Sequence, residues 1–175
     1  MGTDVYQSLE VKQLKVSTGG TFHRAAQVLQ FPASTGKAGA TATVGYVNTG
    51  VDTQMVTLAQ NATADTWVVP LPNLKEGDII TAIGIQGQIE SGGNTATVDY
   101  DLRAQTSVAS GCTDASIQAG TQVSAAADTL LDGHTTMAAD YTVIHGAVPY
   151  FLVTCTTAAA TDIELLKLEI QITQQ

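Results

Sequence analysis

The segment DIELLKLEIQI, residues 162–172, alternates apolar and polar side chains over most of its length. Four apolar side chains occupy every second position: Leu166, Leu168, Ile170 and Ile172. The positions between them hold polar side chains: Lys167, Glu169 and Gln171. Because successive side chains of a strand point to opposite faces, this spacing predicts a β-strand with one dry face and one solvent-exposed face. The same alternation recurs along most of the chain, whereas helical periodicity is almost absent.

A β-hairpin is predicted between Asp78 and Arg103, where two alternating segments flank a Ser-Gly-Gly-Asn turn at residues 91–94. In the first strand, one face carries four isoleucines: Ile79, Ile83, Ile85 and Ile89. In the second, the side chains expected to face the core are Ala96, Val98, Tyr100 and Leu102. Alternation around such a turn is typical of an antiparallel hairpin. Gly84 and Gly87 lie inside the first strand, and we interpret them as marks of a bulge or of close packing.

Shorter apolar segments bounded by Pro, Gly or Asn predict further strands, at residues 11–16, 22–31, 41–47, 54–60, 66–72, 141–145 and 150–156. About nine or ten one-sided strands bury their apolar faces most simply in two packed antiparallel sheets. We therefore predict an all-β fold: an antiparallel two-sheet β-sandwich, jelly-roll-like, with a short N-terminal arm. The alternative is an up-and-down barrel, and no internal repeat indicates a propeller or a solenoid.

The length of 175 residues corresponds to about one domain. We expect an N-terminal arm or edge strand at residues 1–20 and a single β-sandwich domain at residues 21–175. Within that domain, residues around 104–139 are small and polar, which predicts a long loop. A short strand at 117–124 and one or two helical turns at 125–131 are the only elements expected there. Long connections of this kind are usually functional, disordered or contact-making.

The net charge of −9 comes from 16 acidic residues against 7 Lys and Arg residues. Nucleic acid is bound mostly through clustered Lys and Arg, and the basic residues here are scattered. Direct binding of nucleic acid or of an anionic membrane surface is therefore not expected. No apolar run approaches the roughly 20 residues that span a bilayer, and residues 1–14 do not resemble a signal peptide. We expect synthesis and folding in the cytoplasm.

The cysteines and histidines do not indicate a metal site. Cys112 and Cys155 lack the CxxC spacing of a zinc site, and we interpret them as free thiols in a reducing compartment. His23, His134 and His145 form no His-x-His pair of the kind that a metal-binding jelly roll uses. We place His134 in an Asp-Gly-His turn and His145 at a strand end.

Two groups of carboxylates are the remaining candidates for chemistry. Asp99 and Asp101 lie on one face of a predicted strand, about 7 Å apart from the rise per residue, and paired carboxylates can hydrolyse glycosides. The interpretation that we favour is a solvated strand face on which Arg103 balances their charge. A candidate calcium site is formed by four carboxylates near the predicted loop: Asp114, Asp128, Asp132 and Asp140. No EF-hand pattern, serine-protease-like grouping or phosphate loop is present, so we predict no catalytic, cofactor-binding or metal-binding residue and no enzymatic activity.

A carbohydrate-binding module is the main non-enzymatic alternative. Such sites usually use exposed aromatic platforms, but aromatic residues are only 5% of this chain and include a single tryptophan. Trp67 precedes a Val-Val pair and flanking prolines, and we interpret it as a core residue between the sheets. A carbohydrate site would therefore have to be polar and built from loops, such as the segment 105–139.

The layout of two regions resembles that of β-sandwich structural proteins of tailed bacteriophage virions. The first region holds WVVPLPNLKEGDII (67–80), the isoleucine-rich strand, the Gly-Gly-Asn turn and TVDYDLR (97–103). The second holds YFLVTCTT (150–157) and DIELLKLEI (162–170). The resemblance covers roughly residues 60–173. It implies a head decoration protein, a head fibre or a tail adhesin, commonly a trimer, without cofactor or catalysis.

We therefore predict a non-enzymatic virion structural protein, namely a capsid decoration protein that self-associates and stabilises the shell. Its partners would be further copies of itself and the major capsid or other virion proteins, with assembly in the host cytoplasm. The low content of charged residues, 13%, suits close packing against other protein, and the negative net charge limits contact with the packaged genome. The alternative is a carbohydrate- or receptor-binding adhesin domain of a virion fibre.

Overall fold

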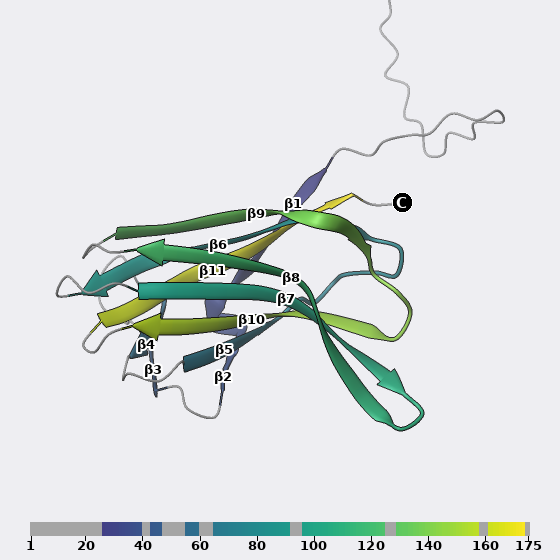
Figure 1. Ribbon diagram of the computed structural model, residues 1–175, viewed down its shortest axis with the longest axis horizontal. Coiled ribbons are helices and arrows are strands. Elements are labelled where there is room, and N and C mark those ends of the chain that lie inside the picture. Colours follow the sequence, from purple (N-terminus) through teal and green to yellow (C-terminus); the bar gives the residue numbers. More distant parts are fainter. Residues whose placement is uncertain are drawn as a thin grey trace, which may run out of the picture.

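A computed structural model of the protein describes residues 26–39, 43–46, 55–59, 65–91, 96–124, 129–157 and 161–173. The shorter strands are β1 (Gln27–Pro32), β2 (Lys37–Ala38), β3 (Thr43–Tyr46), β4 (Val56–Ala59) and β5 (Asp65–Pro70), and a 3-10 helix, η1, spans Ala33–Thr35 (Figure 1). The longer strands are β6 (Ile79–Ser91), β7 (Ala96–Val108), β8 (Gly111–Ser124), β9 (Thr129–Thr142), β10 (Ala147–Thr157) and β11 (Thr161–Thr173). No helix within these ranges is long and apolar enough to cross a membrane. The predicted N-terminal arm at residues 1–20 lies outside the described residues.

The described strands form two antiparallel sheets. Sheet A has six strands, in which β3, β4, β11, β6 and β9 follow in this order and β1 also pairs with β11. Sheet B has five strands in the order β2, β5, β10, β7 and β8. Buried apolar side chains from both sheets form one core. The predicted all-β, two-sheet antiparallel sandwich is confirmed, and the non-sequential strand order differs from that of an up-and-down barrel.

β11, the segment from which the fold is predicted, is a central strand of sheet A. On one side it pairs with β6 along nearly its whole length. On its other side, residues 163–165 pair with β4 and residues 167–172 pair with β1. The strand therefore has hydrogen-bonded neighbours at both edges, and its dry face lies in the middle of the core.

A β-bulge in β11 changes which of its side chains face the core. Opposite β6 the register shifts between Leu165 and Lys167, so Leu166 is an extra residue in the ladder. Leu165 is fully buried, Leu166 is half-buried, and the alternation resumes with Leu168 inside. The prediction that Leu166 shares the dry face with Leu168 is therefore wrong, because an inserted residue reverses the facing of the side chains on either side of it.

Gly87 on β6 makes room for this bulge. A Cβ atom at Gly87 would collide with the carbonyl oxygen of Glu164, two residues before the inserted residue Leu166. Backbone atoms cannot swing aside as a flexible side chain can, so a residue without a side chain is needed here. The interpretation of Gly87 as the mark of a bulge or of close packing is confirmed.

A second irregularity lies at the start of β6. The register against β9 shifts between Ile80 and Ala82, and Ile80 and Ile83 are both buried, whereas Ile79 is half-buried. The prediction that Ile79 shares the inner face with Ile83 is therefore wrong. Opposite β11, Ile80 pairs with Ile172 and Ala82 with Gln171, so Thr81 is an extra residue of β6 that exchanges the two faces of the strand.

The segment predicted as a long loop around residues 104–139 consists mostly of strands. It holds the end of β7, all of β8 and most of β9, and residues 125–128 lie outside the described part of the chain. β7 and β8 form a hairpin whose end projects from the sandwich (Figure 1). The strand predicted at 117–124 is confirmed as the second half of β8. The loop prediction is wrong because backbone hydrogen bonds, rather than bulky side chains, hold these Ala-, Ser- and Thr-rich residues in the ladder.

Trp67 and Tyr100 connect the core to its surroundings by hydrogen bonds. Trp67 is 1% exposed, and its Nε1 donates a hydrogen bond to the carbonyl oxygen of Ala33, 2.8 Å away. The Tyr100 hydroxyl on β7 lies 2.9 Å from Oγ1 of Thr135 on β9, which joins the two sheets at this edge. The interpretation of Trp67 as a core residue is confirmed.

Asp65 and Cys155 lie opposite each other, at the start of β5 and near the end of β10. Both are 0% exposed, and neither carboxylate oxygen of Asp65 has a hydrogen-bond partner among the described residues. Burial disfavours the charged form and raises the pKa of Asp65. Burial also raises the pKa of the Cys155 thiol, and the charges of Asp65 and Asp99 add to this effect. Cys155 and the exposed Cys112 are both free thiols, as predicted.

Replacing Asp65 by asparagine should raise the free energy of unfolding at neutral pH. The folded-state pKa of Asp65 lies above its unfolded value. Its contribution to stability is therefore fully present below the unfolded value of about 3.9 and is lost as the pH rises through the folded pKa. We expect Asp65→Asn to exceed the wild type by about 1–3 kcal/mol at pH 7 and to match it near pH 3. Thermal unfolding of both proteins from pH 3 to pH 8 measures this difference, and a difference that is constant with pH would contradict the prediction.

Candidate functional site

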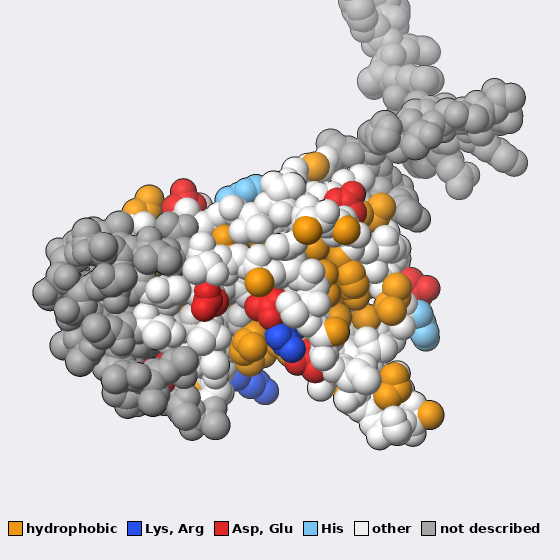
Figure 2. All heavy atoms as spheres, in the orientation of Figure 1, with side chains coloured by type: hydrophobic (Ala, Val, Ile, Leu, Met, Phe, Trp, Pro, Cys, Tyr) orange, Lys and Arg blue, Asp and Glu red, His pale blue; other side chains and the backbone are white. Residues whose placement is uncertain are grey.

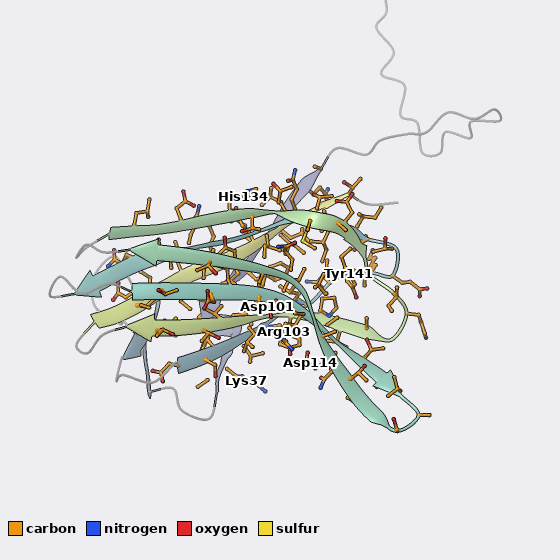
Figure 3. The ribbon with its side chains drawn as sticks, viewed as in Figure 1. Lys37, Asp101, Arg103, Asp114, His134 and Tyr141 are labelled. Atoms are coloured by element: carbon orange, nitrogen blue, oxygen red, sulfur yellow. The ribbon has the colours of Figure 1, made fainter. Side chains whose placement is uncertain are left out.

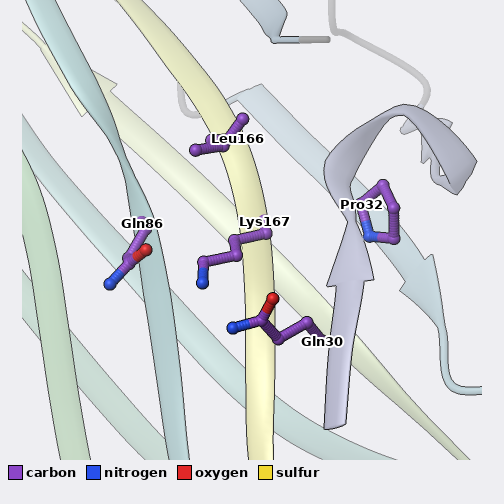
Figure 4. A pocket seen from close by; sticks show the side chains of 5 residues that line it. All are labelled: Gln30, Pro32, Gln86, Leu166 and Lys167. Atoms are coloured by element: carbon purple, nitrogen blue, oxygen red, sulfur yellow. The ribbon is translucent and has the colours of Figure 1, made fainter.

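A hollow of about 500 Å³ opens on the outer face of sheet A. It is lined by side chains from three strands: Gln30 and Pro32 on β1, Gln86 on β6, and Leu166 and Lys167 on β11. Figure 4 shows the Lys167 side chain on β11 between Gln30 and Gln86. Leu166 reaches this face because of the bulge, and bulges commonly re-aim a side chain in this way. The hollow therefore combines two apolar side chains, Leu166 and Pro32, with amide and ammonium groups.

A second, smaller hollow of about 100 Å³ lies farther along β11 on the same face. Its lining residues are Val28, Ala82, Ile83, His134, Glu169, Ile170 and Gln171. The depression arises because the outward positions of β6 hold small residues, Ala82 and Gly84, which pair with Gln171 and Glu169 of β11. A Cβ atom at Gly84 would lie 2.8 Å from Cγ of Glu169. Six of the side chains that line the two hollows are referred to below as the sheet A site: Gln30, Gln86, Leu166, Lys167, Glu169 and His134.

Neighbouring side chains hold the polar groups of the sheet A site in position. Gln86 Nε2 donates a hydrogen bond to Oδ1 of Asp132 on β9, 3.2 Å away. Lys167 Nζ lies 3.6 Å from Oε2 of Glu169. A side-chain amide can form about four hydrogen bonds and an ammonium group about three. Groups that are oriented by one partner but not saturated by it are suited to bind a polar ligand.

The outer face of sheet B carries a hydrogen-bonded network centred on Arg103 (Figure 3). Arg103 donates from Nη1 to Oδ2 of Asp101 at 2.7 Å, and from Nη2 and Nε to Oδ2 of Asp114 at 2.7 and 3.0 Å. The Tyr150 hydroxyl donates to Oδ1 of Asp114 at 2.7 Å. The bond from Arg103, and after it the bond from Tyr150, lowers the pKa of Asp114. The carboxylates of Asp114 and Asp101 in turn raise the pKa of Arg103.

The polar groups of this network are largely occupied by one another, so they offer a ligand on sheet B few hydrogen bonds. Burial, and after it the hydrogen bond to Asp114, raises the pKa of Tyr150 and keeps its hydroxyl a donor. Each charged group of the network already has a charged or hydroxyl partner. Figure 2 shows that charged side chains elsewhere on the visible face are scattered among uncharged ones. The sheet A site is therefore the better candidate for binding.

Asp99 and Asp101 share the outward face of β7, as predicted, and both accept hydrogen bonds from β8. Thr121 Oγ1 donates to Asp99 at 2.6 Å, and Ser116 Oγ donates to Asp101 at 2.6 Å. Arg103 balances the charge of Asp101, which confirms that part of the interpretation. Carboxylates that are held as hydrogen-bond acceptors in a cross-strand ladder are structural, and nothing in their arrangement supports an acid and base pair.

The structure does not bring the candidate calcium ligands together. Asp114 lies on β8 within the Arg103 network, whereas Asp132 and Asp140 lie on β9 of the other sheet. Asp128 lies outside the described residues. Among the residues that the structure describes, no three His, Cys, Asp or Glu side chains are grouped so that they could hold a metal ion. A hard cation needs several oxygen ligands in one place, which these carboxylates do not provide.

The histidines lie apart from one another. His134 is in the middle of β9 and lines the smaller hollow, so the predicted turn at this residue is wrong. The adjacent Gly133 stays inside the strand, where a Cβ atom would lie 2.9 Å from the Tyr100 hydroxyl. His145 is exposed, and its Nδ1 lies 3.2 Å from Oε2 of Glu76. His23 lies outside the described residues.

The sequence did not predict the polar residues of the sheet A site. Gln30, Gln86 and Lys167 occupy outward positions of strands, where polar side chains are normally only solvated. The signal that could have located the site is the Leu-Leu pair at residues 165 and 166, which interrupts the period-two pattern. A glycine inside the facing strand, Gly87, accompanies that interruption.

The fold belongs to the class of two-sheet β-sandwiches that includes carbohydrate-binding modules. One similar structure contains the CBM22-1 and GH10 modules of the endo-1,4-beta-D-xylanase 10B of Clostridium thermocellum, with 15% identity and a TM-score of 0.50 over 88% of this chain and 28% of that chain. A second is the CBM22-1–CBM22-2 tandem domain of Xyn10C of Paenibacillus barcinonensis, with 12% identity and a TM-score of 0.50 over 81% of this chain and 45% of that chain.

Matches at lower similarity include the enzymatically active domain of tailspike protein 4 of bacteriophage CBA120, with 11% identity and a TM-score of 0.41 over 83% of this chain and 19% of that chain. The chain spans less than half the length of each of these three structures. No protein-family model matches the chain, and no curated protein matches it. At these identities the likeness concerns the fold, and it agrees with the two-sheet sandwich described above.

Proposed function

We propose that this protein is a non-catalytic carbohydrate-binding domain that holds its ligand at the sheet A site. The observation that carries the proposal is the hollow that Gln30, Gln86 and Lys167 line together with the apolar side chain of Leu166. Amide and ammonium groups can bind sugar hydroxyls, and an apolar side chain can pack against the C–H groups of a sugar ring. The similarity of the fold to carbohydrate-binding modules supports the same function.

The charges of the site favour an uncharged glycan. Among the described residues, Lys167 is the one basic side chain that lines the larger hollow, and Oε2 of Glu169 lies 3.6 Å from its ammonium group. The net charge of the chain is −9, which repels a polyanionic ligand at a distance. A neutral, hydroxyl-rich oligosaccharide can use the amide groups without meeting this repulsion.

The double variant Gln30→Ala/Lys167→Ala tests the proposed site. The wild type should bind at least one neutral oligosaccharide on a glycan array, and isothermal titration calorimetry with that oligosaccharide then gives the affinity. Each lost hydrogen bond costs about 0.5–1.5 kcal/mol, and about 1.4 kcal/mol corresponds to a tenfold change in affinity. We therefore expect the double variant to bind about tenfold more weakly or worse.

The matched control is Lys37→Ala/Gln105→Ala, which removes the same two residue types from exposed positions on sheet B. It should bind like the wild type and unfold at the same temperature. An array on which no neutral glycan binds would refute the proposal. Equal losses in the two double variants would place the site elsewhere.

Within this proposal the domain serves as a carbohydrate- or receptor-binding adhesin of a virion fibre, which is the alternative that the sequence left open. The fold comparisons support this alternative better than the capsid decoration hypothesis, which stays a prediction. Cosedimentation with capsids distinguishes the two roles. A decoration protein would sediment with the shell whether or not Gln30 and Lys167 are replaced, whereas an adhesin domain would depend on them for binding to a glycan-coated surface.

A further inference from the structure

The end of the β7–β8 hairpin lies outside the two-sheet body (Figure 1). β10 pairs with β7 only as far as Thr106, and every residue from Ser107 to Ser116 is exposed. A two-stranded hairpin with no layer beneath it is marginally stable by itself. A contact made outside one molecule would therefore stabilise this part of the chain.

The outer edge of β8 is open along the projecting part. β8 is the last strand of sheet B, and among the described residues no strand other than β7 pairs with it. Its inner part lies beside β9, where the backbone N–H of Ala138 donates to Oε1 of Gln118 at 2.8 Å. The projecting part, Gly111 to Ser116, offers an edge about 20 Å long, from the rise per residue.

Apart from the charge of Asp114, this edge lacks the features that usually block strand addition. Proteins protect an exposed edge with lysine, proline or a bulge. From Ala104 to Thr113 the chain has no charged residue and no proline. The bulge in β8 lies farther in, at Ile117. Figure 2 shows only hydrophobic and uncharged polar side chains at the projecting end, which includes Val108 with 43% of its surface exposed.

We propose that the β8 edges of two copies of this chain pair antiparallel across a two-fold axis, so that sheet B continues from one protomer into its partner. A two-fold contact uses the same surface on both copies, and an antiparallel strand pair meets this condition. Each copy carries a net charge of −9, so repulsion between two copies is weakest where neither presents a charge. The uncharged end of the hairpin is such a place.

The charge of Asp114 limits the register of the pair. Like charges directly opposite each other destabilise a strand pair, and the Asp114 carboxylate already binds Arg103 on the outer face of sheet B. The two-fold axis therefore does not lie at Asp114, and we place it in the uncharged stretch before that residue, close to Cys112 and Thr113. This arrangement is independent of the proposed glycan site. If both hold, the dimer binds a polymeric glycan with two sites and gains avidity.

Sedimentation equilibrium of the full chain tests the pairing. The wild type should be a dimer, and Thr113→Lys/Ala115→Lys, which places like charges on the proposed edge, should sediment with the mass of one chain. The control Ala38→Lys/Thr156→Lys adds the same charge at exposed positions elsewhere on sheet B and should stay a dimer. A monomeric wild type, or a dimer that persists in the edge variant, would overturn the proposal. Thermal unfolding shows whether each variant is folded.

A short bis-maleimide cross-linker gives a second measurement. Cys112 is exposed and Cys155 is buried, so cross-linking of two copies reports on Cys112. We expect a covalent dimer from the wild type and only monomer from the edge variant. Wild-type protein that stays monomeric after full modification of Cys112 would also overturn the proposal. Glycan affinity per protomer should be equal in the two proteins, which separates this outcome from the test of the sheet A site.

Discussion

Replacing Trp67 by alanine should lower the free energy of unfolding by about 3–5 kcal/mol. The side chain is 1% exposed, and its removal leaves a cavity and takes from the Ala33 carbonyl oxygen one of its two donors, the other being the N–H of Gly36. The nearby backbone cannot close the cavity easily, because it is shaped around the indole ring. A Cβ atom at Gly36 would collide with Nε1 of Trp67. Urea denaturation of the wild type and the variant measures the loss.

The control for this experiment is Trp67→Phe, which keeps most of the apolar volume and removes the indole N–H. It leaves the Ala33 carbonyl oxygen with the N–H of Gly36 as its remaining donor, so we expect a loss of about 0.5–1.5 kcal/mol, the net contribution of one hydrogen bond. The order of stability should be wild type, then phenylalanine, then alanine. A loss within about 0.5 kcal/mol for the alanine variant, as is usual at a surface position, would contradict the role of Trp67 in the core.

The substitution Gly87→Ala should lower the free energy of unfolding by about 3 kcal/mol. The added methyl group would collide with the carbonyl oxygen of Glu164 in the central strand β11. Relief of the collision requires a shift of the bulge, and Leu166 lies in that bulge. We therefore expect weaker glycan binding together with the loss of stability. Thermal unfolding and the calorimetric titration described above measure the two effects.

Gly84→Ala is the matched control, since Gly84 lies on the same strand and faces the flexible side chain of Glu169. The nearest atom to an added Cβ is Cγ of Glu169, at 2.8 Å, and this side chain can turn toward solvent. The nearest backbone atom is the carbonyl oxygen of Gly133, at 3.2 Å, which is a much weaker conflict than the one at Gly87. We expect a loss of about 1 kcal/mol or less. Similar losses in the Gly84 and Gly87 variants would mean that the bulge does not require a glycine.

The sequence predicted the strands wherever the period of two was uninterrupted. The alternation from Lys167 to Ile172 is set by the pleat of a single strand. Its apolar face is buried because the removal of apolar surface from water is favourable. The bulge at Leu166 could not be predicted in this way. The Leu-Leu pair at residues 165 and 166 shows where the alternation breaks, but the identity of the inserted residue depends on the pairing of β11 with the distant strand β6.

The segment 104–139 shows a second limit of sequence reasoning. Its residues are small, so they carry little of the hydrophobic signal from which strands are recognised, although β7, β8 and β9 run through it. The sheet A site shows the same limit. Gln30 and Lys167 line one hollow because Pro32 pairs with Lys167 across β1 and β11. Each residue by itself is only a polar side chain on a solvated strand face.

The position of β11 between β6 and the pair β1 and β4 also determines the order in which the molecule can be built. Gln27 pairs with Ile172, so the first described strand has no partner until nearly all of the described chain has been synthesised. Pairings between such distant residues slow folding, to about milliseconds or seconds for sandwiches. All strands of sheet B precede β11. A nascent chain can therefore form sheet B first and must shield the apolar face of that sheet until sheet A closes over it.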